Sequence, residues 1–133
     1  MAISGKKILL IDDELSFGEI FSILLERENN QLTHFVRVRV QGDDVILMAP
    51  DGKETSLDPT CFDFALVDGR IKGGNMNGWD LAPHLVRLGL PFVAISGADS
   101  LNDQMIKAGA TSAVRKDLLW TQFRDGTFQL SAA

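Results

Sequence analysis

The segment from Phe62 to Arg70 constrains the fold more than any other part of the sequence. Its apolar run, Phe64 to Val67, ends in Asp68 followed by glycine. Such a run is typical of a strand buried on both faces, as in a parallel sheet covered by helices. Ligands bind at the carboxyl edge of these sheets, so Asp68 is placed to act as a nucleophile or metal ligand. Taken alone, the pattern fits a simple turn equally well, because Asp followed by Gly is ordinary turn chemistry.

Three further segments repeat this pattern, and each ends in side chains suited to bind a cation or an anion. These strand ends are Asp12 with Asp13, Ser96, and Lys116. The carboxyl ends of parallel strands share one edge of the sheet, so we expect these side chains to lie together with Asp68. Three clustered carboxylates repel one another unless a cation compensates, and Mg²⁺ is the hard divalent ion that fits best. A hydroxyl and an ammonium group opposite them would clasp a phosphoryl group, which predicts phosphoryl-transfer chemistry.

Helical periodicity follows the strands. From Leu15 to about Glu28 apolar residues recur at the spacing of one helix face. Further helices are predicted after the loop that follows Asp68, from Leu101, and from Leu118. Pro83 lies within the first of these three segments, so that helix is predicted to start near Ala82 or to bend in its first turn. The alternation of strands and helices predicts an α/β fold.

Residues 29–61 carry no helical stripe. Phe35 to Val40 alternates apolar and polar residues, and turn residues precede Val45 to Met48. This pattern predicts a β-hairpin around residues 35–48, with a short third strand near Glu54 to Leu57. An isolated hairpin is marginally stable, so it must pack on the body of the protein or on another chain. Its exposed edge is a candidate homodimer contact.

Composition excludes several classes of function. The length of 133 residues predicts a single domain, residues 1–133. The net charge of −5 argues against nucleic acid as a direct partner, because no basic face is evident. No apolar run reaches the length of a membrane span and no signal peptide precedes the first strand, so we expect a cytoplasmic protein without a membrane partner. The single Cys61 has neither a disulfide partner nor a zinc framework.

The strand-end motifs resemble those of the receiver domain of two-component response regulators. The matching segments cover most of the chain outside residues 29–61 and are Lys7–Glu14, Ala65–Asp68, Met76–Gly78, Ala94–Gly97 and Ala108–Thr111. The resemblance implies a CheY-like, flavodoxin-like fold: a doubly wound five-stranded parallel sheet with helices on both faces. The inserted hairpin then stands where the family has its second helix.

The resemblance also implies a metal site. Asp13 and Asp68 would hold Mg²⁺ together with the backbone carbonyl of Arg70, and Asp12 would hold it through water. The only cofactor implied is Mg²⁺.

Asp68, Ser96 and Lys116 would handle the phosphoryl group. Asp68 would accept it from a phosphohistidine of a sensor histidine kinase or a histidine phosphotransfer protein. Ser96 would bind a phosphoryl oxygen and Lys116 would form an ion pair with the group. The domain would catalyse its own phosphorylation and slow dephosphorylation, and a separate effector protein would read the signal.

The sequence departs from the family pattern at several positions. Lys72 stands where the family usually has proline, in a loop that is longer before Gly78. Asp117 replaces the proline after the lysine, and a cis peptide is not expected there, because a non-proline cis bond costs about 2.5–4 kcal/mol. Ala113 occupies the position of the switch aromatic.

These departures leave two alternatives to a phosphorylatable receiver. The first is a degenerate receiver that acts as a phosphorylation-independent protein-interaction module. The second is an aspartyl phosphatase of another doubly wound family. Such phosphatases usually carry a second acid two residues after the nucleophile, where this chain has Arg70.

Overall fold

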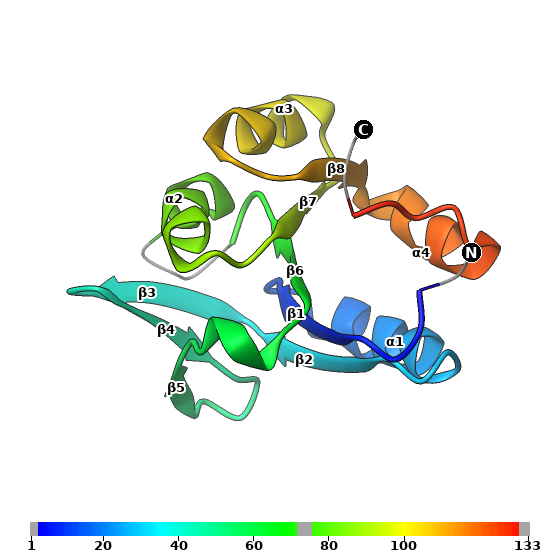
Figure 1. Ribbon diagram of the computed structural model, residues 1–133, viewed down its shortest axis with the longest axis horizontal. Helices are drawn as coiled ribbons and strands as arrows, with labels where there is room; N and C mark the ends of the chain where they lie inside the picture. The colour runs from blue at the N-terminus through cyan, green and yellow to red at the C-terminus, as the bar shows by residue number, and fades with distance from the viewer. Residues whose placement is uncertain (1–2, 72–75, 131–133) are drawn as a thin grey trace.

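The computed structural model describes residues 3–71 and 76–130 (Figure 1). Five parallel strands form the central sheet in the order β2-β1-β6-β7-β8, in which the chain first moves to one edge and then crosses back to the other. This order is that of a doubly wound, flavodoxin-like sheet, as predicted. The strands are β1 (Lys7–Ile11), β2 (Gln31–Phe35), β6 (Phe64–Asp68), β7 (Phe92–Ser96) and β8 (Ser112–Arg115).

Helices cover both faces of this sheet. On one face α1 and α4 bury Phe21, Leu119 and Phe123 against the strands. On the other face Leu81, Leu85 and Met105 of α2 and α3 pack in a second apolar cluster. Each predicted helix is present, and none in the described ranges is long and apolar enough to cross a membrane. The helices are α1 (Leu15–Glu26), α2 (Gly78–Leu88), α3 (Asp99–Ala108) and α4 (Lys116–Asp125), with a 3-10 turn, η1 (Pro59–Cys61).

A second, antiparallel sheet follows β2 and contains β3 (Arg37–Gln41), β4 (Asp44–Met48) and β5 (Glu54–Ser56), in that order. The predicted hairpin and its short third strand are therefore confirmed. Phe35, which the sequence placed in the hairpin, instead ends β2 and pairs with Ile11 in the parallel sheet. The chain passes from one sheet to the other at Val36, whose N–H donates to the carbonyl of Met48 at 2.8 Å. Periodicity cannot mark this change, because the chain is extended on both sides of it.

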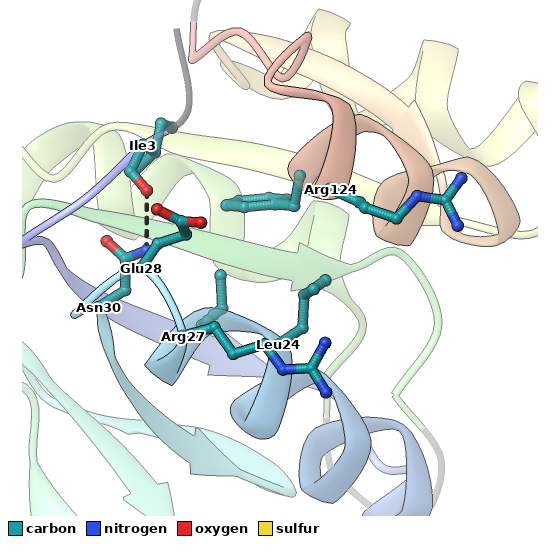
Figure 2. A pocket seen from close by; sticks show the side chains of 8 residues that line it. Ile3, Leu24, Arg27, Glu28, Asn30 and Arg124 are labelled. Atoms are coloured by element: carbon teal, nitrogen blue, oxygen red, sulfur yellow. Dashed lines mark hydrogen bonds between the residues drawn. The ribbon is translucent and has the colours of Figure 1, made fainter.

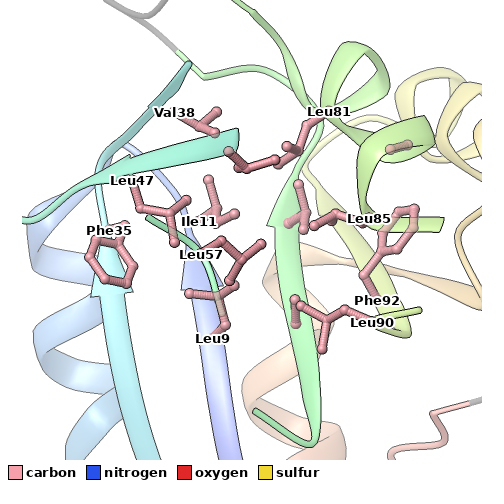
Figure 3. Packing of buried hydrophobic residues seen from close by; sticks show 14 of the residues in the cluster. Leu9, Ile11, Phe35, Val38, Leu47, Leu57, Leu81, Leu85, Leu90 and Phe92 are labelled. Atoms are coloured by element: carbon pink, nitrogen blue, oxygen red, sulfur yellow. The ribbon is translucent and has the colours of Figure 1, made fainter. Parts of the chain in front are cut away.

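The small sheet packs on one face of the parallel sheet (Figure 3). Val38 and Leu47 from its inner face are almost fully buried and join Leu9 and Ile11 of β1 in one cluster. All residues between Phe35 and Phe64 are described, and they contain no α-helix. Alternating apolar residues on two strands thus cover the area that an amphipathic helix would otherwise cover.

The start of α2 differs from the sequence prediction. The helix begins at Gly78, so Pro83 lies in its second turn and not near its start. Two contacts fix this beginning: the Asn77 N–H donates to the Asp80 carboxylate at 3.0 Å, and the Gly78 N–H donates to the carbonyl of Gly69 at 3.0 Å. A Cβ at position 78 would collide with the carbonyl oxygen of Asp68. The prediction near Ala82 was wrong because the proline signal was weaker than this tertiary contact.

Candidate functional site

Three carboxylates meet at the carboxyl edge of the parallel sheet. Asp12 and Asp13 follow β1, and Asp68 ends the neighbouring strand β6. One carboxylate oxygen from each residue lies within 4.8 Å of the others. Asp12 is fully buried, Asp68 is 8% exposed and Asp13 is half-buried. Because β1 and β6 are adjacent and parallel, the local sequence of each strand brings its carboxylate to the same edge.

Burial and mutual repulsion change the proton affinity of this cluster. Burial, followed by the nearby charge of Asp12, raises the pKa of Asp68 to about 6. Lys116 and the backbone N–H of Arg70, which donates to Asp68 Oδ1 at 3.2 Å, oppose the rise. Burial likewise raises the pKa of Asp12, although its contact with Lys116 opposes this. A divalent cation would relieve the repulsion, and carboxylate oxygens are hard donors of the kind that Mg²⁺ binds.

Lys116 is the cation that faces the cluster in the described structure. Its Nζ lies 2.7 Å from Asp12 Oδ2, 3.0 Å from Glu14 Oε1 and 3.6 Å from Asp68 Oδ2. Burial by itself lowers the pKa of Lys116, but the contacts with these carboxylates outweigh burial and raise it. The sequence placed Lys116 at the end of the last strand, whereas it is the first residue of α4. It still points at the carboxylates.

Two residues that the sequence analysis did not assign to the site hold Lys116 in place. Glu14 forms a second ion pair with Lys116. The ring of Phe17 lies beneath the ammonium group, with 4.6 Å between Nζ and the ring centroid. Phe17 in turn stacks on Phe21 with 5.4 Å between ring centroids. A cation over an aromatic face gains electrostatic attraction. The only sequence signal was the position of both residues within one turn of Asp13, because Phe17 otherwise reads as part of the apolar face of α1.

Ser96 and Arg70 complete the open cavity at this edge, which has a volume of about 250 Å³ and is also lined by Asp13 and Asp68. Ser96 is 2% exposed, and its Oγ accepts a hydrogen bond from the N–H of Ala98 at 3.2 Å. The hydroxyl therefore keeps its proton free to donate. Lys72, the residue that stands where the receiver family usually has proline, lies outside the described residues.

A second cavity of about 140 Å³ lies at the other edge of the sheet, between the ends of α1 and α4 (Figure 2). Asn30 is the buried polar residue in its wall, and both ends of its amide are already bonded. The Nδ2 donates to the Ile3 carbonyl at 2.9 Å, and the Oδ1 accepts from the Lys6 N–H at 3.0 Å. Both ends of the Asn30 amide thus serve to hold the N-terminal segment, and the acidic edge remains the candidate site.

Comparison with known proteins places this geometry in a familiar fold. No protein-family model and no curated protein sequence matches the chain. Among solved structures, NtrX from Brucella abortus in complex with ADP matches with a TM-score of 0.66 and 16% identity, over 95% of this chain and 26% of that chain. The receiver domain of NtrX from the same organism matches with a TM-score of 0.64 and 16% identity, over 90% of this chain and 92% of that chain. The chain has the receiver-domain fold.

A third receiver fold comes from a protein of another type. The receiver domain of the sensor histidine kinase PA1611 from Pseudomonas aeruginosa, with a magnesium ion coordinated in its active site cleft, matches with a TM-score of 0.63 and 14% identity, over 93% of this chain and 95% of that chain. At such identities the likeness shows the fold, and function must be argued from the site. The chain spans only 26% of the NtrX chain in the complex with ADP.

Proposed function

We propose that the chain is a phosphoacceptor receiver domain of a two-component phosphorelay, in which Asp68 takes a phosphoryl group from a phosphohistidine. One observation carries the proposal: Asp68 ends the central strand of a receiver fold within 4.8 Å of Asp12 and Asp13. Lys116 and Ser96 stand at the same edge. The donor is a sensor histidine kinase or a histidine phosphotransfer protein.

The residues divide the transfer among them. An Asp68 carboxylate oxygen attacks the phosphorus, the bond from phosphorus to the histidine nitrogen breaks, and that nitrogen keeps the electron pair. Asp13, Asp68 and the Arg70 carbonyl would hold Mg²⁺, with Asp12 bound through water, and the ion would neutralise charge on the phosphoryl oxygens. The Ser96 hydroxyl donates to one of these oxygens. Lys116, whose Nζ lies 3.6 Å from Asp68 Oδ2, would form an ion pair with the phosphoryl group.

A degenerate receiver that binds partners without phosphorylation is the second candidate. Lys116 favours it, because its Nζ lies closer to Asp12 and Glu14 than to Asp68. Ala113 favours it too, since alanine supplies no ring for the family's aromatic switch. The crowded carboxylates favour the first candidate, because their burial and mutual repulsion destabilise the folded state unless a bound cation compensates.

Acetyl phosphate with Mg²⁺, followed by intact mass measurement, separates the two candidates. We expect one added phosphoryl group that hydroxylamine removes, as it does from acyl phosphates. Asp68→Asn should abolish the addition, whereas Asp63→Asn at the other end of the same segment should leave it intact. An unmodified wild-type protein would favour the interaction module.

Arg70 is placed to influence how long the phosphoryl group persists. Its side chain is exposed and lines the cavity beside Asp68, where a hydrolytic water would approach. We propose that it crowds this approach, so that Arg70→Ala shortens the lifetime of the phosphorylated protein. Dephosphorylation followed by mass measurement tests this, and an unchanged rate would remove Arg70 from the mechanism.

We propose that the signal leaves through the loop Gly69–Gly78 and the small sheet that adjoins it. Gly78 packs against the backbone of Asp68, and Ile71 is 3% exposed in the same cluster as Val38 and Leu47. A ligand shifts a conformational equilibrium only through contacts that differ between the states.

Beryllofluoride mimics the phosphoryl group. The changes in amide chemical shift that it causes should therefore concentrate in Gly69–Gly78 and in β3 and β4. Residues 72–75 of that loop lie outside the described structure. Shifts confined to α3 and β8 would contradict this route.

The proposed setting is cytoplasmic, with an effector protein as the output partner. A homodimer through the exposed edge of the small sheet is a weaker proposal. The apolar face of that sheet is already buried on the body of the protein, so a second copy is not needed to stabilise it. Sedimentation at high concentration tests the dimer, and a monomer throughout would exclude it.

A further inference from the structure

His34 contacts the backbone of the acidic site. It lies on β2, and its ring Nε2 is 2.7 Å from the carbonyl oxygen of Asp12. A carbonyl oxygen only accepts hydrogen bonds, so Nε2 carries the proton and donates. The contact joins an edge strand to the residue pair that follows β1.

This bond is one of two that tie Asp12 to β2. The Asp12 N–H donates to the carbonyl of Phe35 at 3.1 Å, and the Asp12 carbonyl accepts from His34. Both backbone polar groups of Asp12 are therefore bonded to adjacent residues of one strand. The Asp12 carbonyl belongs to the peptide that joins it to Asp13, so the His34 bond sets the orientation of that peptide and the direction in which Asp13 leaves it.

Gly18 in α1 makes room for the ring. A Cβ at this position would overlap Nδ1 and its neighbouring ring atoms in His34. The φ of Gly18 is not positive, so its backbone would accept alanine, and the ring is what excludes a side chain. Glycine within a helix is unfavourable, and here the missing side chain lets His34 reach Asp12.

We propose that His34 is a positioning residue for the metal site: through the Asp12 carbonyl it holds the Asp12–Asp13 peptide so that both carboxylates face Asp68. This inference rests on the proposed function, since the site it orients is the one assigned to Mg²⁺. Residues that hydrogen-bond to metal ligands fix ligand direction, and their loss typically weakens metal binding by about 10- to 100-fold. His34 acts one step further out, through the peptide.

The test is the Mg²⁺ dissociation constant, measured from amide shifts of the full chain. His34→Leu removes the donor and should weaken Mg²⁺ binding by about tenfold. His34→Gln keeps an N–H near the same place and should bind Mg²⁺ nearly as the wild type does. Gly18→Ala should displace the ring and match His34→Leu, and the double variant should lose no more than either alone. His84→Leu, at the other histidine of the chain, is the control and should change nothing.

A second readout needs no metal. In the Mg²⁺-free protein His34→Leu should shift the amide resonance of Asp13, while His34→Gln restores it. Lower thermal stability of His34→Leu with an unchanged Mg²⁺ dissociation constant would overturn the proposal and leave His34 a purely structural contact. If the wild type itself binds no Mg²⁺ at millimolar concentration, the proposed function and this inference both fall.

Discussion

The acidic edge of the parallel sheet and the small antiparallel sheet differ in how far their ion pairs are exposed to solvent. At the edge, Asp12 is fully buried and its partner Lys116 has only 14% of its side chain exposed. In the small sheet, Arg39 and Glu54 form an ion pair of 3.0 Å with side chains 39% and 40% exposed. Both pairs are short, but only the first is largely shielded from solvent.

This difference separates stability from function. Exposed ion pairs contribute about 0–1 kcal/mol, so the small sheet depends on its buried Val38, Val45 and Leu47. The attraction within a buried ion pair often does not offset the cost of desolvating its charges. Buried charged groups therefore gather at functional sites, where a bound ligand supplies further compensating charge. Substitutions should therefore have opposite signs in the two regions: loss of an apolar side chain destabilises the small sheet, and loss of the Asp68 carboxylate stabilises the metal-free edge.

The largest effect is expected from Leu47→Ala. Leu47 is 1% exposed between the two sheets, so its truncation should lower the free energy of unfolding by about 2–5 kcal/mol. Denaturant unfolding measures the loss. Ile46→Ala, on the opposite face of the same strand, is the matched control and should cost clearly less. Equal losses would mean that the inner face is not the one that holds the sheet to the body.

Asp68→Asn should have the opposite sign. The pKa of Asp68 rises from 3.8 to about 6 on folding, so the folded state holds the proton more tightly and wild-type stability falls as pH rises through that interval. Above the interval the penalty is about 3 kcal/mol, and the variant escapes it. In Mg²⁺-free buffer Asp68→Asn should unfold at higher denaturant than the wild type at pH 7.5, with the gain vanishing near pH 4. The exposed Asp103→Asn is the control, and a gain that does not change with pH would contradict the electrostatic cause.

Mg²⁺ should stabilise the wild type, because it relieves a repulsion that the unfolded chain does not feel. At ten times its dissociation constant a ligand adds about 1.4 kcal/mol. Thermal melting with and without Mg²⁺ measures this shift, and Asp13→Asn should lose most of it. Arg39→Ala should keep it in full, since the small sheet takes no part in binding. An unchanged shift in Asp13→Asn would argue against the metal site.

The smallest effect should come from Arg39→Ala and Glu54→Ala. We expect each to change the free energy of unfolding by no more than about 1 kcal/mol, and the coupling in a double-mutant cycle to be smaller still. High salt should reduce even this value. A coupling above that range would show that the exposed pair is organised like a buried one, and the contrast between the two regions would fail.

Much of the site was predictable because strand ends are a local signal. An apolar run followed by Asp68 defines a buried strand and its edge without knowledge of any partner. Parallel pairing then brings Asp12 and Asp13 to the same edge whatever the intervening chain does. The alternation in β3 and β4 was equally local, and the hairpin followed from it.

Other features depended on contacts that no local pattern contains. The start of α2 at Gly78 is set by the backbone of Asp68, against which only glycine fits. The strand β2 could not be separated from the hairpin, because both are extended and only pairing with β1 distinguishes them.

By itself, then, the sequence determined which side chains stand at the carboxyl edge, since apolar runs and turn residues act within a few positions of one another. Tertiary structure alone decided what surrounds them: the ring of Phe17 beneath Lys116, and the His34 ring that passes Gly18 to reach Asp12. These contacts join a helix to another helix or to an edge strand. Periodicity indicates which face of a helix or strand is buried. Which residues contact that face is determined only by tertiary packing.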